Sequence, residues 1–282
     1  MAKKSIKKNA GTLRGTNAAD IISVYGSKNK IYGLGGKDKI SVYKGNRHEI
    51  YGGSGNDIIT ISKKSGDNIE VEAGKGIDRI TVSVGNYHDL DGGAGNDIIK
   101  VTGGKGIEID GGTGNDEITV KNGTRFEIDG GTGDDIIRIT GGKGIEIDGD
   151  TGNDRIYINS GKSLDIEAGS GKDKLYIKGG SGHIDLEDGI QKNSVTFTWS
   201  GSIGKFTVDT AVKRTKDVLA IQNADSTDFL FRKSGRSGLI VDCKNTAGEI
   251  LIKDWNSHKT FSGITFADTT LSLSQINKKV GF

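Results

Sequence analysis

The chain has 282 residues, of which only 33% are hydrophobic and 46 are glycine, and this composition argues against an ordinary globular core. No run of about 18 apolar residues is present, and the opening MAKKSIKKN is followed by no apolar signal core, so we expect neither a membrane span nor a cleaved leader. The single cysteine, Cys243, excludes an intramolecular disulfide, and the net charge of +2 conceals lysine-rich segments and regularly spaced aspartates.

Residues 1–14 are interpreted as a basic N-terminal segment that protects one end of a repeat region. Between about residues 15 and 190 an aspartate recurs at intervals of 18, 19 and 21 residues and then of 19 residues. The recurring aspartates are Asp20, Asp38, Asp57, Asp78, Asp97, Asp116, Asp135, Asp154 and Asp173. A fixed short period is typical of proteins that stack copies of one unit, so nine aspartates predict about nine coils.

Each coil contains two stretches in which apolar and polar residues alternate. Ile99 and Val101 flank Lys100 in one stretch, and Ile107 and Ile109 begin the other, with equivalent residues in the neighbouring repeats. Alternation with period two predicts a strand that is buried on one side. Two strands and two glycine turns make a flattened coil, and coils stacked about 4.8 Å apart would bury both apolar stripes in a rod roughly 40 Å long.

The two turns of a coil differ in charge. One turn reads GGxGxD, whereas the other reads GGKG, KNGTR or NSGKS and carries Lys105, Arg125, Lys143 and Lys162. We therefore expect an acidic edge and a basic edge. Outward-facing Glu108, Glu127, Glu146 and Asp165 predict a second acidic ladder, which either pairs with these basic residues or leaves the basic edge to bind a polyanionic polymer.

Residues 191–282 lack the glycine rhythm and predict a small β domain that caps the stack. The segments VTFTW, DVLAI, DFLFR, GLIVD, EILIKDW, GITF and TLSLSQI are read as strands. Such a cap would cover sheet edges that otherwise invite aggregation. Cys243, Trp199 and Trp255 fall in this region and are interpreted as core residues.

The aspartate column itself indicates a bound cation. Carboxylates repeated about 5 Å apart repel one another strongly unless a positive charge lies between them. Glycines with positive φ let backbone carbonyls point into the same space, and a flexible set of carboxylate and carbonyl oxygens is what Ca²⁺ prefers. A divalent ion between consecutive turns would link the coils.

The segments GGSGND at Gly52, GGAGND at Gly92, GGTGND at Gly111 and GGTGDD at Gly130 resemble the calcium-binding repeat of RTX (repeats-in-toxin) proteins. This haemolysin-type family implies an all-β fold, a right-handed parallel β-roll (β-solenoid), with calcium between successive turns of one edge. The carbonyls of Gly93 and Gly95 and the carboxylate of Asp97 would meet the carbonyls of Gly111 and Thr113 and the carboxylate of Asp116. The scheme then repeats from Asp116 to Asp135 and from Asp135 to Asp154.

On the second edge Ile107, Phe126, Ile145 or Leu164 stands where the family has aspartate, so calcium is expected on one edge only, with about three to seven ions. The expected metal-site residues are Gly52, Gly53, Gly55, Asp57, Gly74, Gly76, Asp78, Gly92, Gly93, Ala94, Gly95, Asp97, Gly111, Gly112, Thr113, Gly114, Asp116, Gly130, Gly131, Thr132, Gly133, Asp135, Gly149, Thr151, Gly152, Asp154, Gly171 and Asp173.

The region from DVLAI to TLSLSQI is similar to the β domain that follows RTX repeats, which implies type I secretion and an extracellular location without a cleaved leader. We therefore expect a secreted calcium-binding module that folds when calcium binds. The alternative is a structural or adhesive surface protein in which the roll is a spacer and the basic edge binds a polyanion. An enzyme is the weakest interpretation. No nucleic-acid partner is expected, and the scattered His48, His88, His183 and His258 do not indicate zinc.

Overall fold

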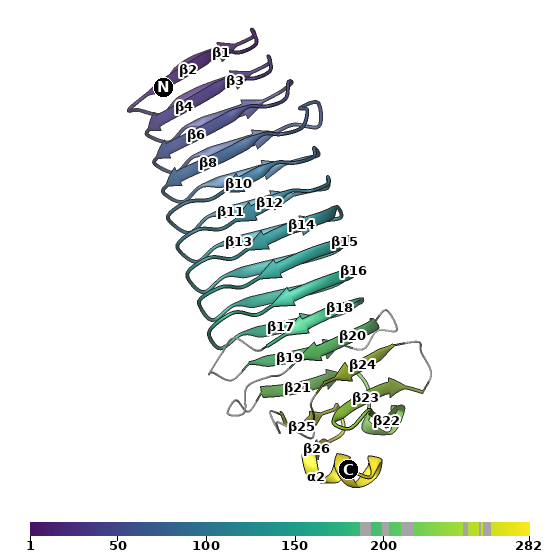
Figure 1. The fold of residues 1–282 in the computed structure, drawn as a ribbon. Coiled ribbons are helices and arrows are strands. Elements are labelled where there is room, and N and C mark those ends of the chain that lie inside the picture. Colours follow the sequence, from purple (N-terminus) through teal and green to yellow (C-terminus); the bar gives the residue numbers. More distant parts are fainter. Residues whose placement is uncertain (187–192, 199–202, 210–216, 245–247, 254, 256–260) are drawn as a thin grey trace. The chain divides into compact units, whose positions relative to one another are not determined.

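A computed structural model describes residues 1–186, 193–198, 203–209, 217–244, 248–253, 255 and 261–282. The described chain is all-β except for a short 3₁₀ turn and one α-helix, and its strands stack as the parallel coils of a β-solenoid, which confirms the predicted fold class. The strands follow one another along the chain in Figure 1. By its internal contacts the chain divides into two compact units, residues 1–136 and 137–282.

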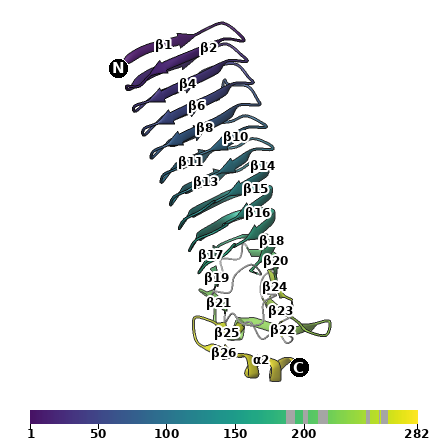
Figure 2. The same ribbon diagram turned by 60° about the vertical axis from the view of Figure 1, so that its left-hand side comes forward.

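The first unit consists of coils with two strands each. Its strands are β1 (Ala2–Ile6), β2 (Thr12–Thr16), β3 (Asp20–Val24), β4 (Lys30–Gly35), β5 (Lys39–Val42), β6 (Glu49–Ser54), β7 (Ile58–Ile61), β8 (Glu70–Lys75), β9 (Arg79–Val82), β10 (Asp89–Asp91), β11 (Ile98–Val101), β12 (Glu108–Asp110), β13 (Glu117–Lys121) and β14 (Thr124–Asp129). The odd-numbered strands pair in parallel as one layer, here called sheet A, and the even-numbered strands pair in parallel as sheet B (Figure 2).

The strand register places identical positions of successive repeats side by side. Ile99 pairs with Ile80 in the coil before it and with Ile118 in the coil after it. Residues at these positions are at most 2% exposed, as are Ile107 and Ile109 on the other strand, so both predicted inward stripes are confirmed. Burying each such aliphatic side chain stabilises the fold by about 1.5–3 kcal/mol, which allows a core only two sheets thick to hold together.

The roll begins earlier than the sequence predicted. Residues 1–14 are not a separate basic segment, because β1 pairs with β3 and β2 pairs with β4 in the regular parallel register. The amide of Ala2 donates to Asp20 Oδ1 at 3.0 Å, as the equivalent amides do in later coils. Lys3 and Lys4 are adjacent in β1, and Lys4 pairs with the buried Ile22, so this segment lacks the apolar alternation that identified the later strands.

The second unit continues the same parallel pairing beyond residue 190. Its solenoid strands are β15 (Ile136–Asp148), β16 (Arg155–Glu167), β17 (Lys174–Ile177), β18 (Gly180–Asp185), β19 (Ser194–Thr198), β20 (Ile203–Asp209), β21 (Asp217–Gln222), β24 (Glu249–Ile252) and β25 (Phe261–Thr265). β19 pairs with β17, β20 with β18, β21 with β19, β24 with β20 and β25 with β21, all in parallel. The predicted boundary at residue 191 is therefore wrong, because apolar alternation maintains the stack after the glycine motif ends.

Antiparallel elements and a helix close this unit. β22 (Phe229–Ser234) and β23 (Gly238–Cys243) form a hairpin that joins β24, and β26 (Thr270–Ser272) pairs with β25. The segment TLSLSQI is a strand only at its start, since helix α2 (Leu273–Val280) follows, with Ser272 and Gln275 in a capping box. The predicted strand failed there because the hydroxyl cap of Ser272 satisfies the first free amides of a helix.

Two of the predicted core residues in this unit can be placed. Trp255 is 1% exposed and donates from Nε1 to Asn277 Oδ1 at 2.8 Å, as expected for a buried indole. Cys243 ends β23 and is only half-buried, so its predicted burial is incomplete. Trp199 and His258 lie outside the described residues.

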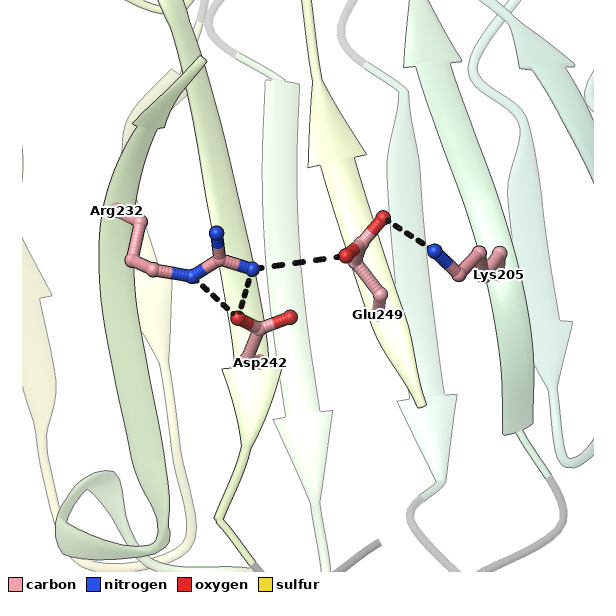
Figure 3. A network of polar contacts seen from close by, with 4 residues as sticks. All are labelled: Lys205, Arg232, Asp242 and Glu249. Atoms are coloured by element: carbon pink, nitrogen blue, oxygen red, sulfur yellow. Dashed lines mark hydrogen bonds and ion pairs between the residues drawn. The ribbon is translucent and has the colours of Figure 1, made fainter. Parts of the chain in front are cut away.

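Charged side chains cross the outer face of the hairpin (Figure 3). Arg232 contacts the carboxylate of Asp242 through its guanidinium and lies 3.7 Å from Glu249, which is itself 3.5 Å from Lys205. These contacts connect β22, β23, β24 and β20 across one surface. The side chain of Arg232 is 53% exposed, so the network fixes strand order more than it adds stability. No helix in the described part of the chain is long and apolar enough to cross a membrane.

Candidate metal centre

The recurring aspartates face the interior of the roll. Asp97 and Asp116 are each 2% exposed, although each follows a glycine turn at the surface. The amide of Asp97 donates to Asp116 Oδ1 at 2.5 Å, and the amide of Asp116 donates to Asp135 Oδ1 at 2.7 Å. Each carboxylate thus binds the aspartate amide of the coil before it. The aspartates stack along one edge, as predicted, but their carboxylates lie inside the turns and not on the outer surface.

Glycine is required where successive turns approach each other. Gly93 and Gly95 have φ of 91° and 132°, which are strained for residues with a side chain. A Cβ on Gly95 would lie 1.5 Å from the carbonyl oxygen of Gly76 in the preceding coil. This close contact between the backbones of successive turns lets the carboxylate of each aspartate reach the aspartate amide of the coil before it.

The ladder of inward side chains extends past the predicted nine aspartates. The amide of Asp173 donates to Asn193 Oδ1, and the amide of Asn193 donates to Asp217 Oδ1, both at 3.0 Å. The sequence contained the signal, since Asn193 and Asp217 lie two residues before the inward-facing Val195 and Leu219. Asn193 also shows that accepting the neighbouring amide does not require a charged side chain, because its neutral amide group provides the Oδ1 acceptor.

The second carboxylate oxygen of these aspartates is the unusual feature of the ladder. Oδ2 is buried and has no hydrogen-bond partner in Asp38, Asp57, Asp78, Asp97 and Asp116. A buried anionic oxygen without a partner is costly, so each one requires a proton or a cation. Hard cations such as Ca²⁺ bind oxygen ligands of this kind.

A backbone carbonyl lies beside each of these oxygens. A Cβ on Gly92 would lie 2.9 Å from Asp97 Oδ2 and 2.6 Å from the carbonyl oxygen of Gly111 in the next coil. The same pair of contacts surrounds Gly52, where the oxygens belong to Asp57 and Ala73. The missing side chain of the first motif glycine therefore leaves a cradle lined by oxygen atoms.

The electrostatics of the ladder agree with this geometry. Burial raises the pKa of Asp38, Asp57, Asp78, Asp97 and Asp116 from 3.8 to about 6, and neighbouring carboxylates contribute a smaller rise. The charged form of the column is therefore disfavoured, and a bound cation would reverse that preference.

Some of the expected carbonyl ligands are already engaged between coils. The amide of Thr113 donates to Gly93 O at 2.8 Å, and the amide of Gly95 donates to Thr113 O at 2.7 Å. The structure thus brings together the Asp97 carboxylate and the Gly111 carbonyl, while Gly93 and Thr113 use their carbonyls to hold the turns in register. Among the described residues no three His, Cys, Asp or Glu side chains form a metal cluster, so carbonyls would have to supply many of the ligands.

The other expected turns occupy equivalent places within their own units. In the first unit Gly53, Gly55, Gly74, Gly76, Gly112, Gly114, Gly131 and Gly133 have positive φ, and in the second unit Gly152 and Gly171 do. Ala94, Thr113 and Thr132 make the coil-to-coil bridges of the first unit, and Thr151 bridges to Ser170 in the second. Ala73 and Ala168 stand where the other turns have the first glycine, so in these two turns a Cβ occupies the cradle.

The exposed carboxylates gather on the outer face of sheet B. On β8, β10, β12 and β14 the outward residues are Glu70, Glu72, Asp89, Asp91, Glu108, Asp110, Glu127 and Asp129. Burial, and then its acidic neighbours, raise the pKa of Glu72. No ion pair joins the predicted ladder of Glu108, Glu127, Glu146 and Asp165 to Lys105, Arg125, Lys143 or Lys162 in the described structure, so that expected pairing is not found. Of the four basic residues, Lys105 lies on a turn, and the other three lie within strands. These are Arg125 in β14, Lys143 in β15 and Lys162 in β16.

Two of the histidines occupy the inward corner of the second edge. His48 and His88 are each 1% exposed and accept an amide of the preceding coil, His48 from Asn29 and His88 from Ile69. Burial lowers the pKa of His88 to about 4, which keeps the ring neutral. On the second edge His48 and His88 therefore do what the aspartates do on the first edge, since each accepts a backbone amide of the coil before it. The sequence signal was again their position two residues before an inward-facing Ile50 or Leu90.

Neither a scan against protein-family models nor a search of curated proteins finds a match for this chain.

Proposed function

We propose that the chain is a calcium-binding roll of the RTX type, in which ions at the aspartate turns drive folding. The observation that carries this proposal is the column of buried Oδ2 atoms without partners beside backbone carbonyls. Five such carboxylates in one unit are difficult to accommodate at neutral pH without a counter-charge. The polar atoms nearest the cradle are oxygens, which favours Ca²⁺ over zinc.

Each residue of the turn has a distinct part in this mechanism. Asp116 Oδ1 fixes the Asp97 amide, and this contact directs Oδ2 of the same carboxylate toward the cradle of its own turn. Gly111 provides both the open side of the cradle and a carbonyl for the coil before it. Calcium, when bound, supplies positive charge that offsets the repulsion between successive carboxylates. Ordering of one turn by an ion then favours ordering of the next turn, because the two turns are joined by coil-to-coil hydrogen bonds.

The cradle geometry also ranks the turns. Ions are expected first at the turns that begin with Gly52, Gly92 and Gly111, where the first glycine leaves the aspartate Oδ2 and the neighbouring carbonyl uncovered by a side chain, and at Gly130, where the sequence motif is the same. The turns at Ala73 and Ala168 should bind more weakly, since their Cβ occupies it. A total within three to seven ions agrees with this ranking. In the same proposal the chain is secreted through a type I route, stays loose at low cytosolic calcium and folds outside the cell.

The rival proposal is a roll that folds without calcium and serves as a structural spacer. The observation that favours it is Asn193, whose neutral amide continues the ladder at a place where no charge needs compensation. In that case the buried carboxyl groups would hold protons instead of ions. Counting the bound ions separates the two proposals.

The experiment is elemental analysis of the full chain after dialysis against calcium at neutral pH. The Asp97→Asn/Asp116→Asn variant should lose at least one ion per chain. The matched variant Glu108→Gln/Glu127→Gln removes the same charge from the outer face of the same coils and should lose none. No bound calcium in the unaltered protein, or equal loss in both variants, would contradict binding at the inner ladder.

A further inference from the structure

A basic strip runs along the second edge of the first unit, opposite the aspartate turns. This strip consists of the segments 7–11, 25–29, 43–48, 62–69, 83–88, 102–107 and 121–125, which connect sheet A to sheet B; the last of them includes the end of β13 and the start of β14. Its basic residues are Lys7, Lys8, Lys28, Lys44, Arg47, Lys63, Lys64, Lys105, Lys121 and Arg125, and all ten are exposed. Asp67 is the one acidic residue in these turns. The strip is therefore far more basic than the whole chain, whose net charge is +2.

The turns of the strip are held in a fixed register. The amide of Lys28 donates to the carbonyl of Asn46, that of Arg47 to Asp67, and that of Tyr87 to Lys105. These bonds repeat from coil to coil, so the charges are spaced by the strand separation of about 4.8 Å. Across seven coils the strip is about 29 Å long. A straight, regularly charged edge of this length suits a linear polymer better than a compact ligand.

A left-handed backbone conformation recurs at the outermost position of the strip. Lys28, Arg47, Tyr87 and Arg125 have φ between 54° and 57°, in the left-handed region. Gly106 occupies the same position in the coil between Tyr87 and Arg125 and has φ of 60°, so glycine also fits this place. A residue with a Cβ costs roughly 1–2 kcal/mol more there. In the first unit the same position is also taken by Ala10 and Asn68, so the turn accepts several residue types. Four of its seven occupants there nevertheless place a long, exposed basic or aromatic side chain at the outermost point of the edge.

Exposed tyrosines stand among these charges. Tyr25 and Tyr43 are 39% and 44% exposed, and their rings stack with centroids 5.1 Å apart. Tyr87 is 53% exposed and has Lys105 Nζ 5.9 Å from its ring centroid. One face of each ring is thus occupied by another side chain. Nucleic-acid bases need open aromatic faces on which to stack in succession, so this arrangement favours hydrogen bonding to a hydroxyl-rich chain.

We propose that this strip binds a linear anionic polysaccharide through charge complementarity and tyrosine hydroxyl groups. The acidic outer face of sheet B borders the strip and repels a polyanion, so the bound chain would be confined to the edge. The site is separate from the aspartate turns and takes a different class of ligand.

The test measures binding of fluorescent dextran sulfate to the calcium-saturated full chain by anisotropy, over a series of salt concentrations. Affinity should fall as salt rises, since the contacts release counterions. The variant Lys28→Gln/Arg47→Gln/Lys64→Gln should bind at least about tenfold more weakly. The matched variant Lys39→Gln/Arg79→Gln/Lys100→Gln removes the same charge from the exposed face of sheet A and should change affinity less than about threefold.

Circular dichroism spectra of both variants should match that of the unaltered protein, because all six side chains are exposed. Equal weakening by the two variants would overturn the proposal, since net charge alone would then explain binding. Absence of salt-dependent binding would overturn it as well. Tighter binding of a single-stranded thymidine oligonucleotide of equal charge would overturn the choice of polysaccharide. None of these results depends on how many calcium ions the protein binds.

Discussion

At the scale of single residues, the aspartate ladder combines two functions in one carboxylate. In Asp116, Oδ1 completes a backbone hydrogen bond of the fold, whereas Oδ2 is buried without a partner. The first function needs only an oxygen acceptor, as Asn193 demonstrates. The second function, binding of a cation by Oδ2, needs the negative charge of a carboxylate. Substitution by asparagine should therefore separate them.

The substitution Asp116→Asn should have opposite effects with and without calcium. In chelator the variant should be more stable than the unaltered protein by about 1–2 kcal/mol, because a buried charge is removed while the acceptor remains. In excess calcium it should be less stable, because one ligand is lost. Urea denaturation at pH 7.5 measures both differences. Glu108→Gln, on the exposed face, should show no such reversal, and an equal shift in both buffers for Asp116→Asn would refute its role as a ligand.

The pH dependence of the calcium-free protein follows from the same ladder. Burial raises the pKa of Asp38, Asp57, Asp78, Asp97 and Asp116 to about 6, so protons bind more tightly to the folded state than to the unfolded one. Their contribution is complete below about pH 4 and is lost as pH rises through about 6, at up to about 2 kcal/mol per group. Denaturation in chelator between pH 4 and pH 8 tests this. Stability that is constant or that rises over this range would be inconsistent with buried, unpaired carboxyl groups.

At the scale of the strand and turn, most of the roll could be predicted from the sequence. Alternation identified the inward stripes because Ile99 and Val101 are followed at fixed distance by Ile107 and Ile109. The same count of two also places Asp97 inward, but the edge and the ligand role predicted from the glycine turn did not include burial of the carboxylate. Burial of a carboxylate depends on the amide of the neighbouring coil, and a local sequence pattern does not contain that partner.

Other elements were missed for related reasons. β1 has a lysine-rich sequence, and its assignment as a strand depends on pairing with β3. β20 and the helix α2 lie beyond the repeat, where no internal copy could set the register. The outward acidic ladder of Glu108 and Glu127 was predicted, but its extension to β8 and β10 was not.

Turn glycines should differ sharply in their tolerance of a side chain. Gly114 has φ of 131°, and its Cβ would lie 2.0 Å from the carbonyl oxygen of Gly95, so Gly114→Ala should destabilise the roll by more than about 3 kcal/mol. Gly103, at φ of 155°, has nothing within 4 Å of an added Cβ, and Gly103→Ala should cost only about 1 kcal/mol. Thermal unfolding of the two variants in calcium gives the comparison. Similar melting temperatures would mean that turn stacking does not limit stability.

At the scale of the whole molecule, charges are sorted by surface. Within the first unit the inner ladder is acidic and buried, the outer face of sheet B is acidic and exposed, and the second edge is basic. A near-neutral total thus hides a buried acidic ladder, an exposed acidic face and an exposed basic edge. The proposed calcium sites and the proposed polysaccharide strip lie on opposite edges of the same coils, so ordering of the roll by ions would also align the basic strip.

The central claim is that calcium at the aspartate turns drives folding, and thermal unfolding tests it most directly. Far-ultraviolet circular dichroism of the full chain at pH 7.5 should be recorded in chelator, in excess calcium and in equal magnesium. The account predicts little β-structure or a low melting temperature in chelator, a rise of at least about 10 °C in calcium, and a much smaller rise in magnesium. Superimposable curves in chelator and calcium would contradict it and would favour a roll that folds without ions.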